Sequence, residues 1–171
     1  GVHLTGAAAG AIAERAGVPA AGPAAPLPLT LPRLLEQAVE RGGEGEALIA
    51  PGRDGQFRTL TYPELDRNTN RLARALIERG ACPDTPIAIA LPRSVDSVSA
   101  TWAVAKSGAA FVPIDPTYPR ERINYMLTDC GALVGVTTSD IRPNLPDWVE
   151  WILLDDDRVS AAIDRLSAVA L

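Results

Sequence analysis

The chain's only lysine, Lys106, stands in a Lys-Ser-Gly tripeptide, a set of residue types that can bind phosphate. An ammonium group neutralises the anion, and a glycine lets backbone amides approach it. Phosphate loops join a strand to the start of a helix, however, and this tripeptide is predicted to end a helix and precede a strand. No G-x-x-x-x-G-K-[ST] or G-x-G-x-x-G pattern follows a predicted strand. We therefore interpret Gly108 as a left-handed residue that ends the helix and Lys106 as a partly exposed cation at its negative end.

The acidic run Asp155-Asp156-Asp157 could contribute ligands to Mg²⁺. It directly precedes a helix-like segment, Ser-Ala-Ala-Ile-Asp-Arg-Leu, where carboxylates cap a helix and interact with its positive end. A metal site would also need ligands that converge from elsewhere in the chain. The pattern favours a helix cap.

Other residue types that support catalysis or ligand binding are sparse. A single histidine, His3, excludes a Ser-His-Asp triad within this chain. Cys82 and Cys130 form no C-x-x-C, which indicates a reducing compartment, and both are predicted to be buried as small hydrophobic residues. Trp148 and Trp151 lack the basic neighbours of a base-stacking surface. The sequence predicts no catalytic, cofactor-binding or metal-binding residue in this chain.

Composition excludes several classes of partner. The 171 residues are 47% hydrophobic and 22% charged, with a net charge of -5, which is typical of a globular chain that binds neither nucleic acid nor an anionic membrane. No apolar run approaches the roughly 20 residues that cross a bilayer. We expect a cytoplasmic protein.

Two regions differ in composition. Residues 1–28 are rich in Ala, Gly and Pro and are predicted to be a linker or the tail of a preceding module, either as a short helix over Ala7–Arg15 or as a tether without structure. Residues 29–171 are predicted to form the ordered region. Because the chain lacks an initiator methionine, we expect it to be part of a longer protein.

Helix signals recur along residues 29–171. Thr30 is predicted to cap a helix that ends at Gly42-Gly43, and Thr61 and Glu64 have the spacing of a capping box. Ser94 is predicted to cap a helix that ends near Gly108. The side chains expected to face inward are Leu31, Leu34, Leu35, Ala38 and Val39 in the first of these helices, and Val95, Val98, Trp102 and Ala105 in the last.

Strand signals alternate with these helices. Asp54-Gly55 predicts a hairpin between residues 47–50 and 57–60. Apolar runs predict further strands, with 86–91 and 109–114 both buried, followed by 133–137 and 151–154; a helix is expected over 119–129. Short loops between alternating strands and helices imply an α/β fold, a mainly parallel sheet flanked by helices.

Two stretches resemble the first two core motifs of amino-acid adenylation domains of nonribosomal peptide synthetases, within the wider superfamily of adenylate-forming enzymes. The similarity covers about Leu27 to Asp156. The matching positions are Leu60, Thr61, Tyr62, Glu64 and Leu65 in the first motif, and Lys106, Gly108, Ala110, Phe111, Val112, Pro113, Asp115, Pro116, Tyr118, Pro119, Glu121, Arg122 and Tyr125 in the second.

The resemblance implies a two-step reaction in the intact protein. An amino-acid carboxylate reacts with ATP to give an aminoacyl-AMP, and a phosphopantetheine thiol on a carrier domain then takes the acyl group. ATP and Mg²⁺ are the implied cofactors, and the implied partners are the remainder of the adenylation domain and the condensation and carrier domains. The family's phosphate loop, nucleotide-contacting motifs and late catalytic lysine have no counterpart in these 171 residues. We therefore expect residues 29–171 to be an incomplete N-terminal subdomain, inactive alone.

Two alternatives remain open at the level of sequence. The chain could be a noncatalytic α/β interaction module that completes a partner polypeptide, or part of another carboxylate-activating ligase of the same superfamily.

Overall fold

A computed structural model describes residues 30–52 and 54–171. The predicted helix at Ala7–Arg15 and the proposed linker at 1–28 therefore lie outside the described residues. In the described part the element order is α2 (Leu31–Gly42), β1 (Glu46–Pro51), β2 (Phe57–Thr61), α3 (Tyr62–Ile77), β3 (Pro86–Ile89), α4 (Val95–Lys106), β4 (Ala110–Pro113), α5 (Arg120–Cys130), β5 (Val134–Thr137), η1 (Arg142–Asn144), β6 (Glu150–Leu153) and α6 (Asp157–Asp164).

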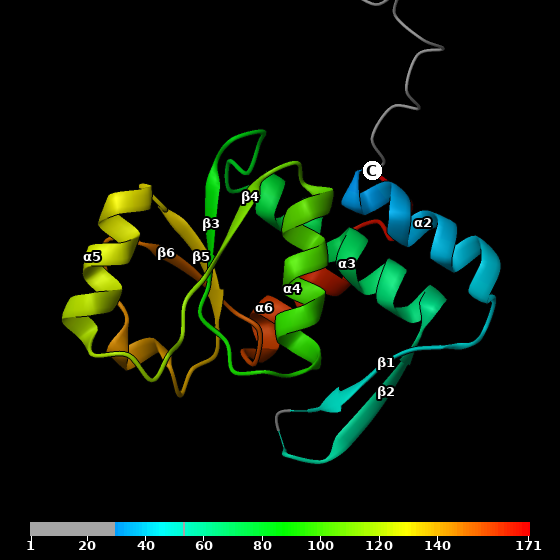
Figure 1. The fold of residues 1–171 in the computed structure, drawn as a ribbon, viewed down its shortest axis with the longest axis horizontal. Helices are drawn as coiled ribbons and strands as arrows, with labels where there is room; N and C mark the ends of the chain where they lie inside the picture. The colour runs from blue at the N-terminus through cyan, green and yellow to red at the C-terminus, as the bar shows by residue number, and fades with distance from the viewer. Residues whose placement is uncertain (1–29, 53) are drawn as a thin grey trace, which may run out of the picture.

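Four of the described strands form one parallel sheet in the order β4-β3-β5-β6 (Figure 1). The predicted α/β fold with a parallel sheet flanked by helices is confirmed. The chain runs from β3 through α4 to the outer strand β4, and then crosses back through α5 to β5 on the other side of β3. The connections therefore lie on both faces of the sheet, as in doubly wound α/β proteins.

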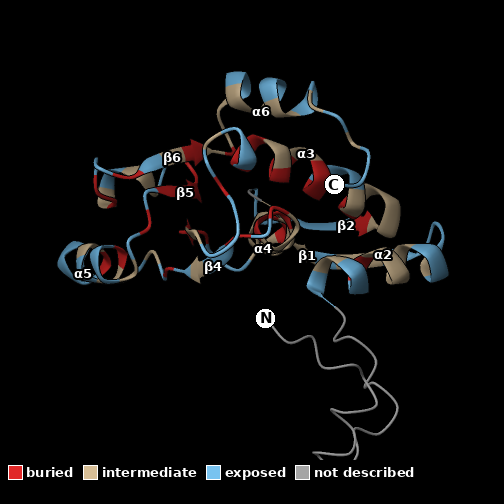
Figure 2. Cartoon of the chain, turned by 90° about the horizontal axis from the view of Figure 1, so that it is seen from above, coloured by how far each residue is buried: buried red, intermediate tan, exposed pale blue. Residues whose placement is uncertain are grey.

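Each face of the sheet has its own apolar core. Helices α3, α4 and α6 pack on one face, in a core that includes Leu76, Val104 and the strand residue Ile152. Helix α5 packs on the other face through Ile123 and Leu127. Figure 2 shows these buried segments in red on both sides of the strands. Met126, which is partly buried, also packs against this second core.

A separate hairpin, β1–β2, packs with α2 against α3 and the start of α4. Its strands are antiparallel, and Gly55 in the turn has φ +75°, as the Asp-Gly signal predicted. Leu35, Leu60, Leu65 and Val95 form the small core beneath it.

The predicted helix caps are present. The Thr61 amide donates to Glu64 Oε2 at 2.9 Å, and the Glu64 amide donates to Thr61 Oγ1 at 3.4 Å. These bonds stabilise the carboxylate and lower the pKa of Glu64. Ser94 and Ser97 form a second reciprocal cap at α4. The hydroxyl of Thr30 accepts from the amide of Arg33 at the start of α2.

Two predicted faces were only partly correct. In α2, Leu35 is buried and Val39 packs against the small core as predicted, but Leu31 and Leu34 are 45% and 43% exposed. In α4, Val95 is buried as predicted, but the residues that face the sheet are Ala100, Ala103 and Val104. Val98, Trp102 and Ala105 are partly exposed, although Trp102 packs against the small core of Leu35, Leu60, Leu65 and Val95.

The prediction that 109–114 is a buried strand was also wrong for its middle. Within the described residues β4 pairs with β3 alone and lies at the edge of the sheet. Ala110, Phe111 and Pro113 are exposed, although the flanking Ala109 and Ile114 are buried. The apolar run gave the strand correctly, but its burial depends on neighbouring segments that composition does not reveal.

Gly135 in the middle of β5 gives a test of the core packing. A Cβ at this position would overlap the indole ring of Trp151 on β6, whose N–H donates to the Pro146 carbonyl at 3.0 Å. We expect Gly135→Ala to destabilise the fold by about 1–3 kcal/mol, because the ring cannot move without breaking this bond. Urea denaturation measures the effect.

Trp151→Leu supplies the control. In the double variant the smaller side chain leaves room for the new methyl group, so the loss should be smaller than the sum of the two single losses. Additive losses would show that the close approach of Gly135 and Trp151 is not what constrains residue 135.

Candidate functional site

Lys106, the strongest sequence candidate for chemistry, lies inside the protein and forms a salt bridge. Its Nζ donates to Asp66 Oδ1 at 2.6 Å and to Asn70 Oδ1 at 2.7 Å, and its side chain is 5% exposed. The predicted place of Lys106 in the last turn of α4 is confirmed, but the interpretation that its charge is partly exposed was wrong, because the side chain packs against α3. The related prediction for Gly108, a left-handed residue after the helix, is confirmed by its φ of +82°.

The same cluster fixes the end of the described chain. Asn70, which is 1% exposed, donates through Nδ2 to Asp66 Oδ2 at 3.0 Å and to the Ala168 carbonyl at 2.9 Å. Arg74, one turn further along α3, donates to the Val169 carbonyl at 2.7 Å. Helices α3 and α4 and the segment after α6 thus meet at one polar cluster.

Burial dominates the electrostatics of this cluster. Loss of solvent lowers the pKa of Lys106 below its ordinary value, and the hydrogen bond and charge of Asp66 oppose that change. The ammonium group makes three hydrogen bonds, the third to the Asp66 carbonyl at 3.2 Å, which is its full donor capacity. No donor is left for a phosphate.

Sequence reasoning missed Asp66 and Asn70. A signal was present: the two polar residues are four positions apart, which places them on one side of α3, and Asn70 lies in a helix whose neighbouring residues Thr69 and Leu72 are buried. Polar side chains next to a buried helix stripe need partners. The partner of both side chains is the chain's one lysine.

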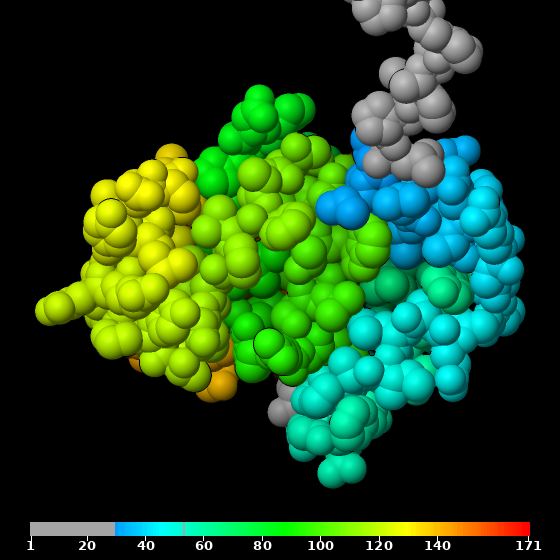
Figure 3. All heavy atoms as spheres, viewed as in Figure 1, coloured from blue at the N-terminus to red at the C-terminus, as the bar shows by residue number. Residues whose placement is uncertain are grey.

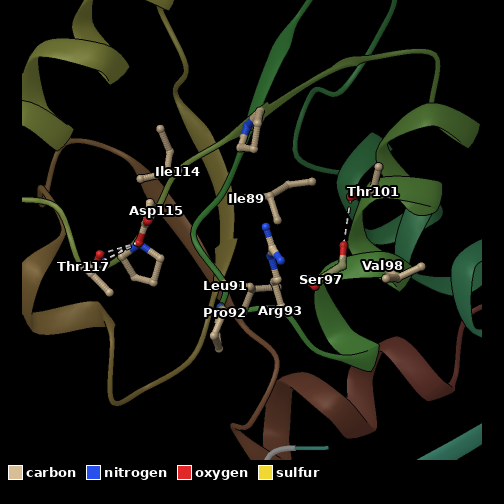
Figure 4. Close-up of a pocket in the computed structure, with 12 residues that line it drawn as sticks. Ile89, Leu91, Pro92, Arg93, Ser97, Val98, Thr101, Ile114, Asp115 and Thr117 are labelled. Carbon is tan, nitrogen blue, oxygen red and sulfur yellow. Dashed lines mark hydrogen bonds between the residues drawn. The ribbon is translucent and has the colours of Figure 1, made fainter. Parts of the chain in front are cut away.

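A cleft of about 600 Å³ opens at the carboxyl ends of β3 and β4, beside the start of α4. In α/β proteins this end of the sheet is where ligands bind. Figure 4 shows Arg93 reaching into the space from the end of β3, with Asp115 and Thr117 on the opposite wall. Ser97, Val98 and Thr101 of α4 line a third side.

Most polar groups of this cleft are engaged in local structure. The amide and hydroxyl of Thr117 donate to Asp115 Oδ1 at 2.9 and 2.7 Å, which lowers the pKa of Asp115. Ser97 belongs to the α4 cap, and the Thr101 hydroxyl donates to the Ser97 carbonyl. Arg93 is exposed and was not singled out in the sequence. The cleft offers one exposed guanidinium, with no nucleophile beside a base among its described lining residues.

The side chains of Asp155 and Asp156, in the acidic run considered for Mg²⁺, bind different parts of the chain. Asp156 caps α6 by accepting from the amides of Arg158 and Val159, so the predicted cap is confirmed. Asp155 instead accepts from the amide and hydroxyl of Ser139. Across residues 30–52 and 54–171, no group of three or more His, Cys, Asp or Glu side chains is arranged to hold a metal ion.

The remaining sequence candidates lie apart from the cleft. Cys82 is exposed, which corrects the prediction that it is buried, and Cys130 is half-buried with its thiol directed at the Leu127 carbonyl. Both cysteines are free. His3 lies outside the described residues. In the described part, no helix combines the length and apolar character needed to cross a membrane.

Comparison with known proteins gives the family. Residues 35–168 match the family described as AMP-binding enzyme. The chain belongs to this family. Gramicidin S synthase 2 of Brevibacillus brevis is 40% identical over 129 residues, which cover 75% of this chain and 3% of that protein. The chain thus spans a small part of this relative's length.

Solved structures agree with this assignment. The nonribosomal peptide synthetase FmoA3 (S1046A), with α-methyl-L-serine-AMP bound, superposes with a TM-score of 0.73 at 26% identity, covering 86% of this chain and 16% of that one. The N-terminal domain of FACL13 from Mycobacterium tuberculosis has a TM-score of 0.72 at 22% identity, covering 83% of this chain and 37% of that domain, and shows the same fold. The resemblance to adenylation domains is confirmed.

Lys106 should matter for stability. We expect Lys106→Ala to lower the free energy of unfolding by about 2–3 kcal/mol, because Asp66 and Asn70 lose a buried partner; the loss is moderated by the partial exposure of Asp66. Arg79→Ala, which removes the exposed ion pair with Glu150, is the matched control and should cost at most about 1 kcal/mol. Chemical denaturation compares the two variants. Equal, small losses would contradict a supporting role for the Lys106 cluster.

The lowered pKa of Lys106 gives a pH dependence with a defined sign. Between the lowered folded-state pKa and the ordinary value of 10.5, the unfolded chain binds more protons at this residue than the folded chain. The contribution of Lys106 to the free energy of unfolding therefore increases with pH in this window. At lower pH this contribution does not change with pH. We expect the difference in unfolding free energy between the wild type and Lys106→Met to grow in favour of the wild type as pH approaches 10.5. A difference that shrinks as pH rises would show that the pKa is raised instead.

Proposed function

We propose that this chain is the N-terminal scaffold of an amino-acid adenylation domain of a nonribosomal peptide synthetase, with residues 29–171 forming part of that domain and residues 1–28 linking it to a preceding module. In the intact protein, a carboxylate oxygen of the amino acid attacks the α-phosphorus of ATP, giving aminoacyl-AMP and pyrophosphate. The sulfur of a carrier-bound phosphopantetheine then attacks the acyl carbon and releases AMP. The remainder of the adenylation domain and the condensation and carrier domains are the proposed partners.

One observation carries the scaffold role: the second family motif folds into a structural junction. Lys106 donates its hydrogen bonds to Asp66 and Asn70. Gly108 turns the chain from α4 into β4, and Asp115 forms a turn with Thr117. The first motif forms the cap of α3 at Thr61. The reactive-site interpretation of Lys106 would need its ammonium group to be free.

The described residues do not fit ATP and Mg²⁺ by themselves. Asp155 and Asp156 accept from separate backbone amides, and Arg93 is a lone guanidinium in the cleft. A triphosphate needs several converging donors and a metal. No step of the reaction is therefore assigned to a residue of this chain. We propose that the cofactor-binding groups come from the rest of the AMP-binding region.

Pyrophosphate exchange tests the proposal. We expect the 171-residue chain alone to show no amino-acid-dependent exchange of pyrophosphate into ATP, and the intact synthetase to show it. Clear exchange by the purified chain would overturn the scaffold role. If the intact protein catalyses exchange with a fatty or aryl acid but with none of the amino acids, the result would favour another carboxylate-activating ligase of the superfamily.

A further inference from the structure

An apolar groove of about 320 Å³ lies between α2, α4 and the edge strand β4. We call it the Trp102 groove; it is lined by Leu31, Val98, Thr101, Trp102, Ala105 and Phe111. An adjoining hollow shares Leu31, Ala105 and Phe111 and extends to Pro32, Ala109 and Ala110. None of these lining residues is charged. Leu31 and Phe111 are 45% and 41% exposed.

The groove is formed by residues that were expected to face the core. Ala100, Ala103 and Val104 of α4 face the sheet. Val98 and Trp102 lie on another side of the helix and line the groove, and Trp102 also packs against the small core under the hairpin. Figure 3 shows the face on which α4 (green) and α2 (blue) lie side by side. Exposed apolar surface of this kind, continuous across three elements, marks an interaction site.

The edge of β4 limits how a partner can bind there. The amides of Ala110 and Ile114 donate to the Thr85 and Ile89 carbonyls on the side of β3. Because successive backbone groups alternate in a strand, positions 111 and 113 present theirs outward, and Pro113 has no N–H to donate. A long ladder with an added strand is therefore disfavoured. The contact must rest on apolar side chains packed against Trp102 and Phe111.

The opposite edge of the sheet is protected in a different way. Glu150 on β6 pairs with Arg79 at 3.1 Å, and charged side chains blunt an edge strand. The Val159 and Ile163 side chains of α6 pack against the core on the α3 side. The two edges of the sheet therefore differ: β6 begins at an ion pair, whereas β4 borders the apolar Trp102 groove.

We propose that the Trp102 groove is the surface on which the remaining part of the AMP-binding region docks, through apolar side chains rather than strand addition. This inference rests on the proposed function. The chain corresponds to 37% of the FACL13 N-terminal domain, so most of a domain of that kind lies outside it and has to pack on it. A second copy of this chain is a poorer occupant, because two chains of net charge -5 repel each other.

A split-protein experiment tests the docking surface. The chain and the remaining part of the AMP-binding region, supplied from the parent gene as a second polypeptide, are mixed and their affinity is measured by ultracentrifugation. We expect a complex with the wild type, and at least a tenfold weaker one with Leu31→Glu/Phe111→Glu. Tyr125→Glu on α5, which is 69% exposed and outside the groove, is the control and should bind like the wild type.

Measurements on the chain alone separate docking from folding. Since Leu31 and Phe111 are already more than one-third exposed, the double variant should melt within a few degrees of the wild type. It should also bind less anilinonaphthalene sulfonate, because the groove is then charged. A variant that unfolds is replaced by Leu31→Ser/Phe111→Ser, for which the same tenfold loss is expected.

Three results would overturn the inference: no complex with the wild type, equal affinity of the groove variant and the Tyr125 control, or a wild-type dimer that the groove substitutions convert to a monomer. The last would assign the groove to self-association. A different result would count against the proposed function alone: the intact synthetase shows no pyrophosphate exchange, but the two polypeptides still form a complex that the groove substitutions weaken. The two outcomes are separable because the affinity is measured without the reaction.

Discussion

The buried contact between the Lys106 ammonium group and the side chains of Asp66 and Asn70 fixes how the two central helices sit on the sheet. Lys106 is the last residue of α4, and Asp66 and Asn70 lie on α3. A charged group at this depth is stable only with its hydrogen bonds complete, so the two helices have a single relative position in which the cluster is satisfied. The segment 168–170 is bound to the same cluster and to Arg74.

The position of α4 sets the course of the chain beyond it. Two residues after Lys106, Gly108 adopts φ +82° and redirects the backbone into β4, and after β4 the Asp115 turn leads into α5 on the opposite face. The second family motif thus connects α4 on one face of the sheet to α5 on the other face. The same path builds one wall of the cleft at the carboxyl ends of β3 and β4. The motif therefore shapes a site whose reactive groups it does not supply.

Packing on the two sides of α4 explains the exposed apolar surface. Ala100, Ala103 and Val104 allow a close approach to the sheet, and this leaves Val98 and Trp102 on the flank. A helix with apolar side chains on more than one side is typical of the interior of a larger domain. In the described part of the chain, one flank of α4 has no covering layer, which agrees with the small share of its relatives that this chain represents.

Features that depend on neighbours within about four residues could be predicted from the sequence. The caps at Thr30, Thr61 and Ser94, the hairpin at Gly55, the positive φ of Gly108 and the alternation of strands and helices all arise from such local hydrogen bonds and backbone preferences. The burial of Lys106, the edge position of β4 and the exposure of Cys82 could be read only from the folded chain. Solvent access at these residues depends on which distant segments cover them, and hydrophobic periodicity records only that a surface is apolar. The partner of Lys106 lies 40 residues away along the chain, at a contact that exists only after α3 and α4 have packed.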